Sequence, residues 1–166
     1  MTSDLQYYFN FSDDVRNSCI EGKLIEKDQL SISFDDCKKI VKYFGGIFDS
    51  NPSYKLSSMI KISENEFKIE CNPDVNSLDI IHELGHAFLH FNDMEINDRY
   101  SCDGNSFEDI EACIFSRAFI MPKPLFEKVV FKYVIDGICN LIDVARTFNV
   151  ECIQADLRGK ELNIWE

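Results

Sequence analysis

The sequence predicts an α+β fold in which several helices pack on a small antiparallel sheet. Two observations lead to this fold class. Residues 59–63 and 67–71 alternate apolar and polar side chains, as half-buried strands do. Residues 33–44 and 107–120 instead repeat apolar side chains at helical spacing. The chain has 166 residues, 45% of them hydrophobic, and can bury one core, so we expect a single domain over residues 1–166.

The N-terminal half carries the clearest local signals. Ser33 and Asp36 stand in the positions of a capping box at the start of a helix over residues 33–44, which Gly45 ends. A short polar turn joins the two strands, and a further helix begins near Asn76 or Ser77. Residues 1–30 are rich in aromatic and acidic side chains, and the sequence assigns them no role.

The C-terminal half is predicted to be helical after a polar loop at residues 92–106. The helix at residues 107–120 ends before Pro122, because a proline cannot continue it. Two more helices are expected at residues 125–135 and 137–148, followed by a short one.

Composition restricts the classes of partner. The chain has 29 Asp+Glu against 17 Lys+Arg and a net charge of −12, which disfavours nucleic acid and anionic membranes and favours a basic protein. Seven cysteines without a Cys-x-x-Cys pair indicate reduced, mostly buried thiols. The sequence shows no secretion signal and no apolar run of ~18 residues. We therefore expect a cytoplasmic protein.

All three histidines lie in residues 82–90, and the first two belong to the sequence HELGH, an HExxH motif. On a helix, His82 and His86 share one face and can bind one zinc ion, while Glu83 is placed to act as general base and acid in hydrolysis. His90 lies about 12 Å along the helix axis from His82, so it cannot share that metal ion and is expected in an outer or surface position.

A catalytic zinc ion needs a third protein ligand, and no histidine follows residue 90. The candidates are Glu108, Asp109 and Glu111 at the start of the helix at residues 107–120, or less favourably Cys102 or Cys113. Asp109 lies in line with the apolar stripe of that helix, whereas the two glutamates lie at its edge or off it.

The pair of segments HELGHAFLH (82–90) and DIEACIFSRAFIMP (109–122) resembles the ImmA/IrrE family of small zinc metallo-endopeptidases, which have a zincin-like active-site helix. The resemblance covers about residues 66–122, the expected catalytic centre, and the C-terminal helices follow at about 124–166. Alignment on Ala112 places Asp109 where the family has a glutamate that resembles the third zinc ligand of other zinc peptidases.

Two departures from the family pattern concern the metal site. Asp109 is one methylene shorter than glutamate, so either its helix lies closer to the metal, or Glu108 reaches in, or metal affinity is reduced. Cys113 stands where asparagine or aspartate is frequent, and we expect it to remove a hydrogen-bonding partner near the ligands.

The resemblance implies a narrow function, the cleavage or other inactivation of a helix-turn-helix transcriptional repressor, often one encoded nearby on a mobile element. The alternative is a regulatory protein that binds a repressor or toxin partner stoichiometrically without cleaving it. DNA binding through residues 139–160 is disfavoured by the acidic charge. The group that stabilises the oxyanion stays open among Tyr100, Arg117 and Tyr133.

Overall fold

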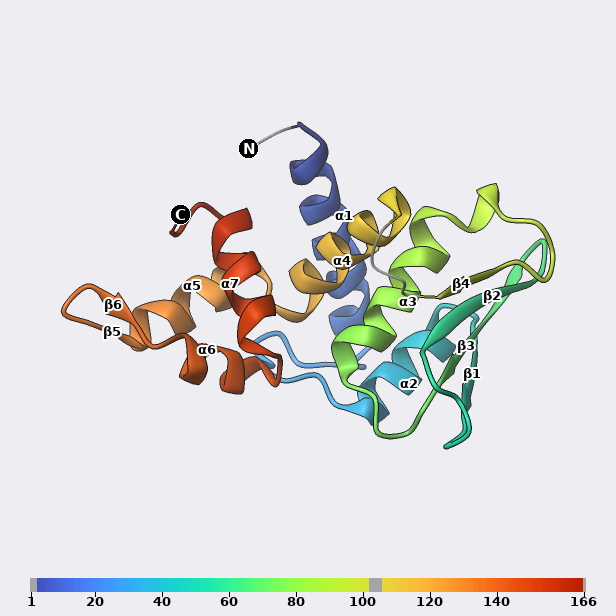
Figure 1. The fold of residues 1–166 in the computed structure, drawn as a ribbon, viewed down its shortest axis with the longest axis horizontal. Coiled ribbons are helices and arrows are strands. Elements are labelled where there is room, and N and C mark those ends of the chain that lie inside the picture. Colours follow the sequence, from blue (N-terminus) through green and yellow to red (C-terminus); the bar gives the residue numbers. More distant parts are fainter. Residues whose placement is uncertain (1–2, 102–105, 166) are drawn as a thin grey trace. The chain divides into compact units, whose positions relative to one another are not determined.

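The computed structural model describes residues 3–101 and 106–165, which form an α+β fold (Figure 1). The predicted fold class is confirmed. Two compact units are distinguished by their internal contacts, one formed by residues 33–116 and the other by residues 1–32 together with 117–166. The single domain expected for residues 1–166 stays a prediction. No helix in the described part of the chain is both long and apolar enough to cross a membrane.

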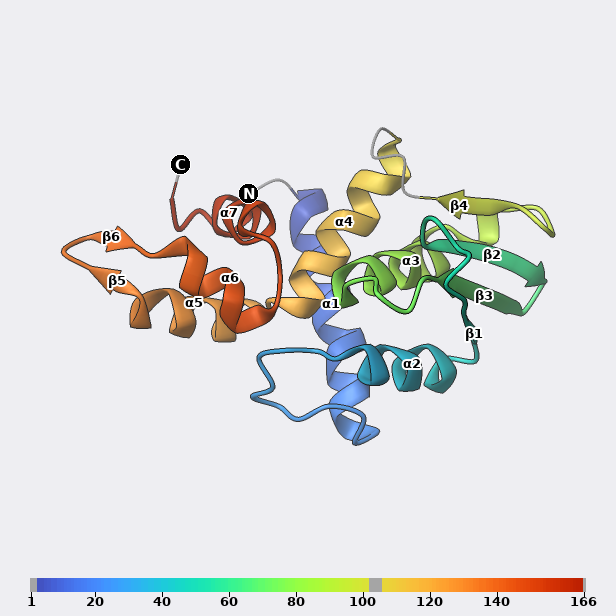
Figure 2. The same cartoon turned by 60° about the horizontal axis from the view of Figure 1, so that its bottom comes forward.

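The unit of residues 33–116 combines a sheet with helices. In chain order its elements are α2 (Phe34–Tyr43), β1 (Ile47–Ser50), β2 (Ser58–Ser63), β3 (Glu66–Cys71), α3 (Ser77–Leu89), η1 (Phe91–Asp93), β4 (Arg99–Ser101) and the start of α4 (Phe107–Ile120). Helix α3 packs against β2, β3 and β4, and α2 packs against α3 and β1 (Figure 2). The core of this unit therefore lies between the sheet and these two helices.

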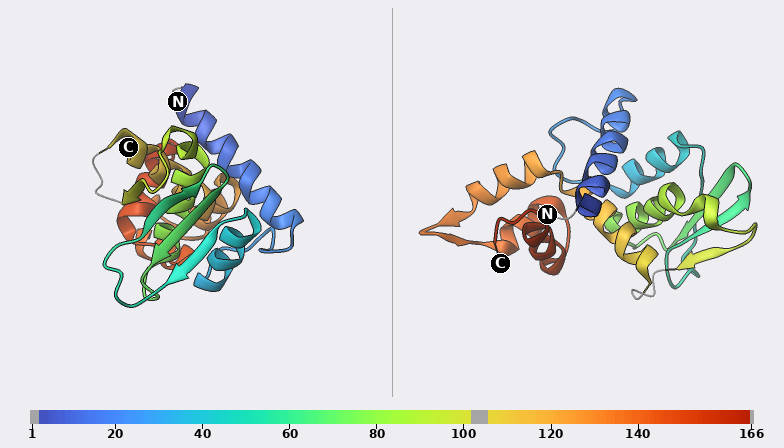
Figure 3. Two further views of the ribbon diagram at one scale, coloured as in Figure 1. Left: turned by 90° about the vertical axis from the view of Figure 1, so that its right-hand side faces the viewer. Right: turned by 90° about the horizontal axis from the view of Figure 1, so that it is seen from above.

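The sheet has the strand order β1-β3-β2-β4 (Figure 3). The expected hairpin is present, because β2 and β3 pair in antiparallel orientation. However, β1 pairs with β3 in parallel, so the sheet is mixed rather than purely antiparallel. Strand β4, within the polar loop expected at residues 92–106, pairs with β2 and forms one edge.

Side-chain caps fix where the helices of this unit begin. The capping box at α2 is present, with the Ser33 hydroxyl accepting from the Asp36 N–H at 3.1 Å and the Asp36 carboxylate accepting from the Ser33 N–H at 3.0 Å. At α3, the side chain of Asn76 accepts from the Asp79 N–H at 2.9 Å. The start of α3 determines which of its residues face the sheet and which face α4.

The second unit is mostly helical. It contains α1 (Ser3–Glu21), the end of α4, α5 (Lys123–Lys132), β5 (Val134–Ile135), β6 (Ile138–Cys139), α6 (Leu141–Phe148) and α7 (Cys152–Glu161). The helices expected at residues 125–135 and 137–148 were placed too close together, because β5 and β6 form a hairpin between them. Asp136 and Gly137 turn this hairpin with positive φ angles of 51° and 79°, a conformation that Asp-Gly pairs favour.

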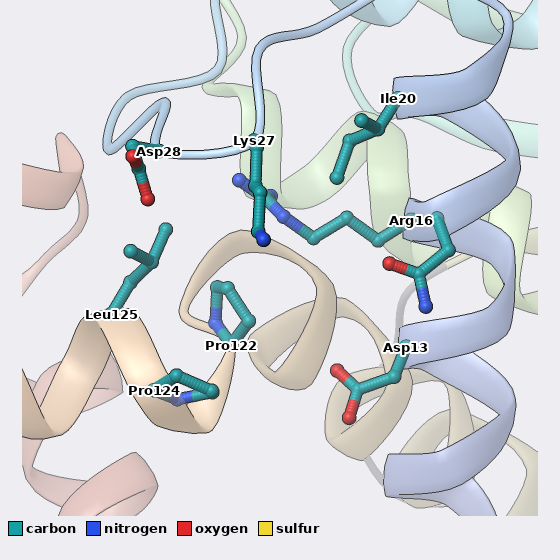
Figure 4. A pocket seen from close by; sticks show the side chains of 9 residues that line it. Asp13, Arg16, Ile20, Lys27, Asp28, Pro122, Pro124 and Leu125 are labelled. Atoms are coloured by element: carbon teal, nitrogen blue, oxygen red, sulfur yellow. The ribbon is translucent and has the colours of Figure 1, made fainter.

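Two buried arginines satisfy backbone carbonyls at the end of α4. Arg16 donates to the Phe119 carbonyl and to the Gln29 carbonyl, each at 2.7 Å. Arg158 donates to the Met121 carbonyl at 3.0 Å. Figure 4 shows the Arg16 side chain extending from α1 into a pocket of about 270 Å³ beside Lys27. The bond to the Phe119 carbonyl replaces an intrahelical partner that the last carbonyls of a helix lack, and the bond to the Met121 carbonyl follows directly after the helix.

Candidate metal centre

Helix α3 carries two histidines whose side chains point toward the same position. His82 and His86 are one helical turn apart, and both are buried. Their Nε2 atoms lie 3.0 Å from each other. Burial, followed by the neighbouring His82 and His90, lowers the pKa of His86 to about 3. His86 is therefore a neutral imidazole, which is the form that binds a metal ion.

Helix α4 adds a carboxylate to the two imidazoles. The Oδ1 atom of Asp109 lies 3.2 Å from His86 Nε2 and 3.5 Å from His82 Nε2. Asp109 is 3% exposed. The hydroxyl of Ser106 accepts from the Asp109 N–H at 3.0 Å, which caps α4 and fixes the turn that carries the carboxylate.

The spacing of these three atoms fits a metal ion. Zinc binds nitrogen and oxygen ligands at about 2.0–2.1 Å, so a tetrahedral site separates its ligands by roughly 3.3 Å. The three separations here, 3.0, 3.2 and 3.5 Å, bracket that value. Within the described residues, His82, His86 and Asp109 are the group with this ligand geometry. Two imidazoles and one carboxylate are also a donor set that zinc accepts.

Glu83 is a buried carboxyl group on the same helix. It is 0% exposed, and neither carboxylate oxygen accepts a hydrogen bond of normal geometry from the described residues. Burial raises the pKa of Glu83 to about 8. The Met59 backbone opposes this upward shift, and the nearby Asp109 adds to it. Buried polar groups without partners are costly, and strongly shifted pKa values cluster at functional sites.

The second nitrogen of His82 also has a neighbour. Cys113 Sγ lies 3.4 Å from His82 Nδ1, one helical turn after Asp109 on α4. We expected Cys113 to remove a hydrogen-bonding partner near the ligands, and the structure places its thiol in contact with His82. A thiol is a weak acceptor, so the contact orients His82 less firmly than a carboxylate would.

Three rings, those of His86, His90 and Tyr100, lie next to one another beside the ligand atoms. Tyr100, on the edge strand β4, lies face to face with His86 at 4.4 Å between ring centroids and with 4° between their planes. Its ring also lies 5.8 Å from that of His90. His90 is 6% exposed, so it is not a surface residue, and its Nε2 lies 3.6 Å from Glu111 Oε2. His90 and Tyr100 thus enclose one side of His86.

The other residues considered as ligands lie elsewhere. Glu111 faces His90. The pKa of Glu108 is lowered mainly by a hydrogen bond to its own backbone; desolvation opposes this shift, and the Ser106 side chain adds to it. Cys102 lies outside the described residues.

Among the residues considered for stabilising the oxyanion, Arg117 pairs with Glu161 in the second unit. The sequence suggested Tyr100 only as one of three oxyanion candidates, and its stacking on His86 depends on the pairing of β4, which no local pattern revealed.

Comparison with known families agrees with this site. A model of a peptidase family, described as the IrrE N-terminal-like domain, matches residues 73–160, more than half of the chain. The chain belongs to this family. The resemblance to the ImmA/IrrE peptidases is therefore confirmed. Among curated proteins no match was found. The matched range includes α3 and α4, which carry the buried group of His82, His86 and Asp109.

Proposed function

We propose that the protein is a zinc-dependent endopeptidase of the HExxH type that cleaves a basic helix-turn-helix repressor. His82, His86 and Asp109 would hold one zinc ion, and Glu83 would act as general base and acid. The observation that carries this proposal is the convergence of three buried ligand atoms at separations of 3.0–3.5 Å. Membership of a peptidase family supports the same chemistry.

A zinc ion held by these three residues would act as a Lewis acid toward the scissile carbonyl. The Glu83 carboxylate takes a proton from the attacking water and passes it to the leaving amine nitrogen. Without a cation the pKa of Glu83 is about 8, and a dication nearby favours its charged, basic form. Burial of Glu83 keeps bulk water from competing for this proton.

The distribution of charge supports a basic substrate. Residues 33–116, which contain the site, have 16 Asp+Glu against 7 Lys+Arg, whereas the other unit, residues 1–32 and 117–166, has 13 against 10. The acidic charge of the chain is therefore concentrated in the unit that would meet the substrate. A DNA-binding repressor carries the opposite charge, and such complementarity accelerates association. Initial cleavage rates should fall as salt is raised, and a rate independent of salt would contradict a basic substrate.

The deciding experiment combines metal analysis with a cleavage assay. Purified protein should contain about one zinc per chain, and the Asp109→Ala variant should lose it. Wild-type protein mixed with candidate repressors should yield two fragments, and Glu83→Gln should retain zinc and yield none. Cleavage by Glu83→Gln at the wild-type rate would refute the role of Glu83. A stable complex that relieves repression without fragments would favour the stoichiometric binding protein instead.

A further inference from the structure

Helices α3 and α4 come into close contact at Gly85, next to the second histidine. A methyl group added to Gly85 would lie 3.3 Å from the Ala112 Cα atom and 3.0 Å from Phe115 Cδ1. Both distances are shorter than ordinary carbon–carbon contacts of about 3.5–4.0 Å. Ala112 and Phe115 are 0% exposed, so their surroundings leave them little room to retreat.

The aspartate ligand lies one turn before this contact on α4. Asp109 precedes Ala112 by three residues and therefore lies on the same side of α4. Its Oδ1 atom reaches both imidazoles, at 3.2 and 3.5 Å. A glutamate at this position would carry one more methylene into a place where His86 is 0% exposed and Asp109 is 3% exposed. The helix separation and the length of the carboxylate are thus matched in this chain.

We infer that Gly85 is a positioning residue that brings α4 close enough to α3 for an aspartate to serve as the third metal ligand. This inference rests on the proposed metal site and adds a structural reason why an aspartate can serve as its third ligand. Whether the carboxylate at position 109 reaches both imidazoles depends on the contact between the helices as well as on the residue type. Of the possibilities that the shorter Asp109 left open, this contact accounts for a helix that lies closer to the metal.

The physical reason is the narrow tolerance of metal coordination. Ligand distances in zinc sites hold to within about 0.2 Å. A methyl group on Gly85 would require Ala112 or Phe115 to move by a few tenths of an ångström. Such a movement of α4 would carry the Asp109 carboxylate out of range, because its short side chain cannot extend further. A glutamate side chain has an additional torsion and can restore the reach.

The test is a double-mutant cycle on zinc affinity, measured by competition with a chelator, with Gly85→Ala and Asp109→Glu as the single variants. We expect each single variant to weaken zinc binding by roughly tenfold or more. We expect the double variant to bind zinc at least about fivefold more tightly than the product of the single effects predicts. Strictly additive effects would overturn the inference. So would an Asp109→Glu variant that binds zinc as tightly as the wild type, which decides the matter even if Gly85→Ala does not fold.

A matched control separates this coupling from general loss of packing. Ile80→Val trims a buried side chain on the same helix without adding volume between the helices. Combined with Asp109→Glu it should give additive effects, and coupling of equal size would overturn a specific role for Gly85. Failure of the wild type to bind zinc would overturn the metal site and this inference together. Zinc coupling without cleavage of any repressor would refute only the proposed activity.

Discussion

At the scale of single residues, Glu83 shows how a buried carboxyl group makes stability depend on pH. Its carboxyl group is fully buried without a hydrogen bond of normal geometry, and its pKa is raised to about 8. Between pH 4.5, the ordinary pKa of a glutamate, and pH 8, the folded chain keeps a proton on Glu83 that the unfolded chain releases. The stabilisation is therefore complete below pH 4.5 and is lost as the pH rises through 8.

The unfolding free energy of the metal-free protein should accordingly fall between pH 5 and pH 8. The expected slope from Glu83 is on the order of 1 kcal/mol per pH unit. In Glu83→Gln this part of the slope should disappear, because glutamine does not titrate. Urea unfolding in the presence of a chelator measures both proteins, and Glu95→Gln, at an exposed carboxyl, is the control that should keep the wild-type slope. Parallel curves for wild type and Glu83→Gln would contradict the buried, protonated carboxyl.

Cys113 gives a second prediction at this scale. Its thiol lies 3.4 Å from His82 Nδ1 and is a weaker acceptor than a carboxylate. Cys113→Asp should therefore tighten zinc binding, and Cys113→Ala should weaken it by roughly tenfold. Chelator competition gives both affinities. Cys139→Ala, in the second unit, serves as the control and should leave the affinity unchanged. Equal affinities in all variants would show that the thiol has no influence on His82.

At the scale of elements, the end of α4 depends on side chains distant in sequence. Arg16 donates two hydrogen bonds of 2.7 Å to carbonyls, and burial lowers the pKa of its guanidinium to about 10. A charged group is retained in this buried position because the carbonyls need donors. Helix α4, whose first turn carries Asp109, is therefore anchored at its other end by a side chain from α1.

Arg16→Met should lower the unfolding free energy by about 2–4 kcal/mol, because it leaves the Phe119 and Gln29 carbonyls without these donors. Methionine preserves most of the aliphatic stem, so the loss reports mainly on the hydrogen bonds. Arg146→Met removes an exposed ion pair with Asp143 and should change stability by less than about 1 kcal/mol. Urea unfolding compares the two, and losses of equal size would argue against an anchoring role for Arg16.

The elements also show what could be predicted from the sequence. Helices α2 and α3 begin at Ser33 and Asn76 caps, and the β2–β3 hairpin follows from alternation, because these signals are local. Strands β1 and β4 were missed because four and three residues are too few to show a period. The hairpin after α5 was missed although Asp136-Gly137 is a strong turn signal. Its two-residue strands lie between helical patterns that concealed it.

The candidate metal centre was likewise predictable from the sequence only in part. HELGH on one helix is enough to place His82 and His86 together, since their proximity is a property of helical spacing. Asp109 was favoured over Glu108 and Glu111 by its place in the apolar stripe of its helix and by the family alignment. The approach of Cys113 and the stacking of Tyr100 depend instead on how α4 and β4 meet α3. Those contacts are tertiary, and no spacing within one segment encodes them.

At the scale of the whole molecule, buried thiols make stability depend on alkaline pH. Burial raises the pKa of Cys19 and of Cys37 to about 12, from an ordinary value of 9.0. Between these values the unfolded chain releases protons that the folded chain keeps. The contribution of each thiol to stability is therefore complete below pH 9 and is lost as the pH rises toward 12. One of these residues lies in each compact unit.

The unfolding free energy should thus decline from pH 9 to pH 11 under reducing conditions. Cys19→Ala should have a shallower decline than the wild type, although its stability at pH 8 is lower because a buried side chain is trimmed. The slopes, taken from urea unfolding at several pH values, are the quantities to compare. Cys152→Ala, at an exposed site, should keep the wild-type slope. A Cys19→Ala slope equal to that of the wild type would exclude thiol ionisation as the cause.

The contact between Cys113 and His82 also bears on how the protein ages after purification. Cys113 is partly exposed, so peroxide can reach a sulfur atom whose neighbour is the imidazole of His82, a proposed metal ligand. Each added oxygen enlarges the sulfur group and presses it against the His82 ring, so metal would be lost from stored samples as oxidation proceeds. Preparations kept in air should therefore become heterogeneous in zinc content. A non-thiol reductant suits this protein best, since soft thiolate reagents would themselves compete for zinc.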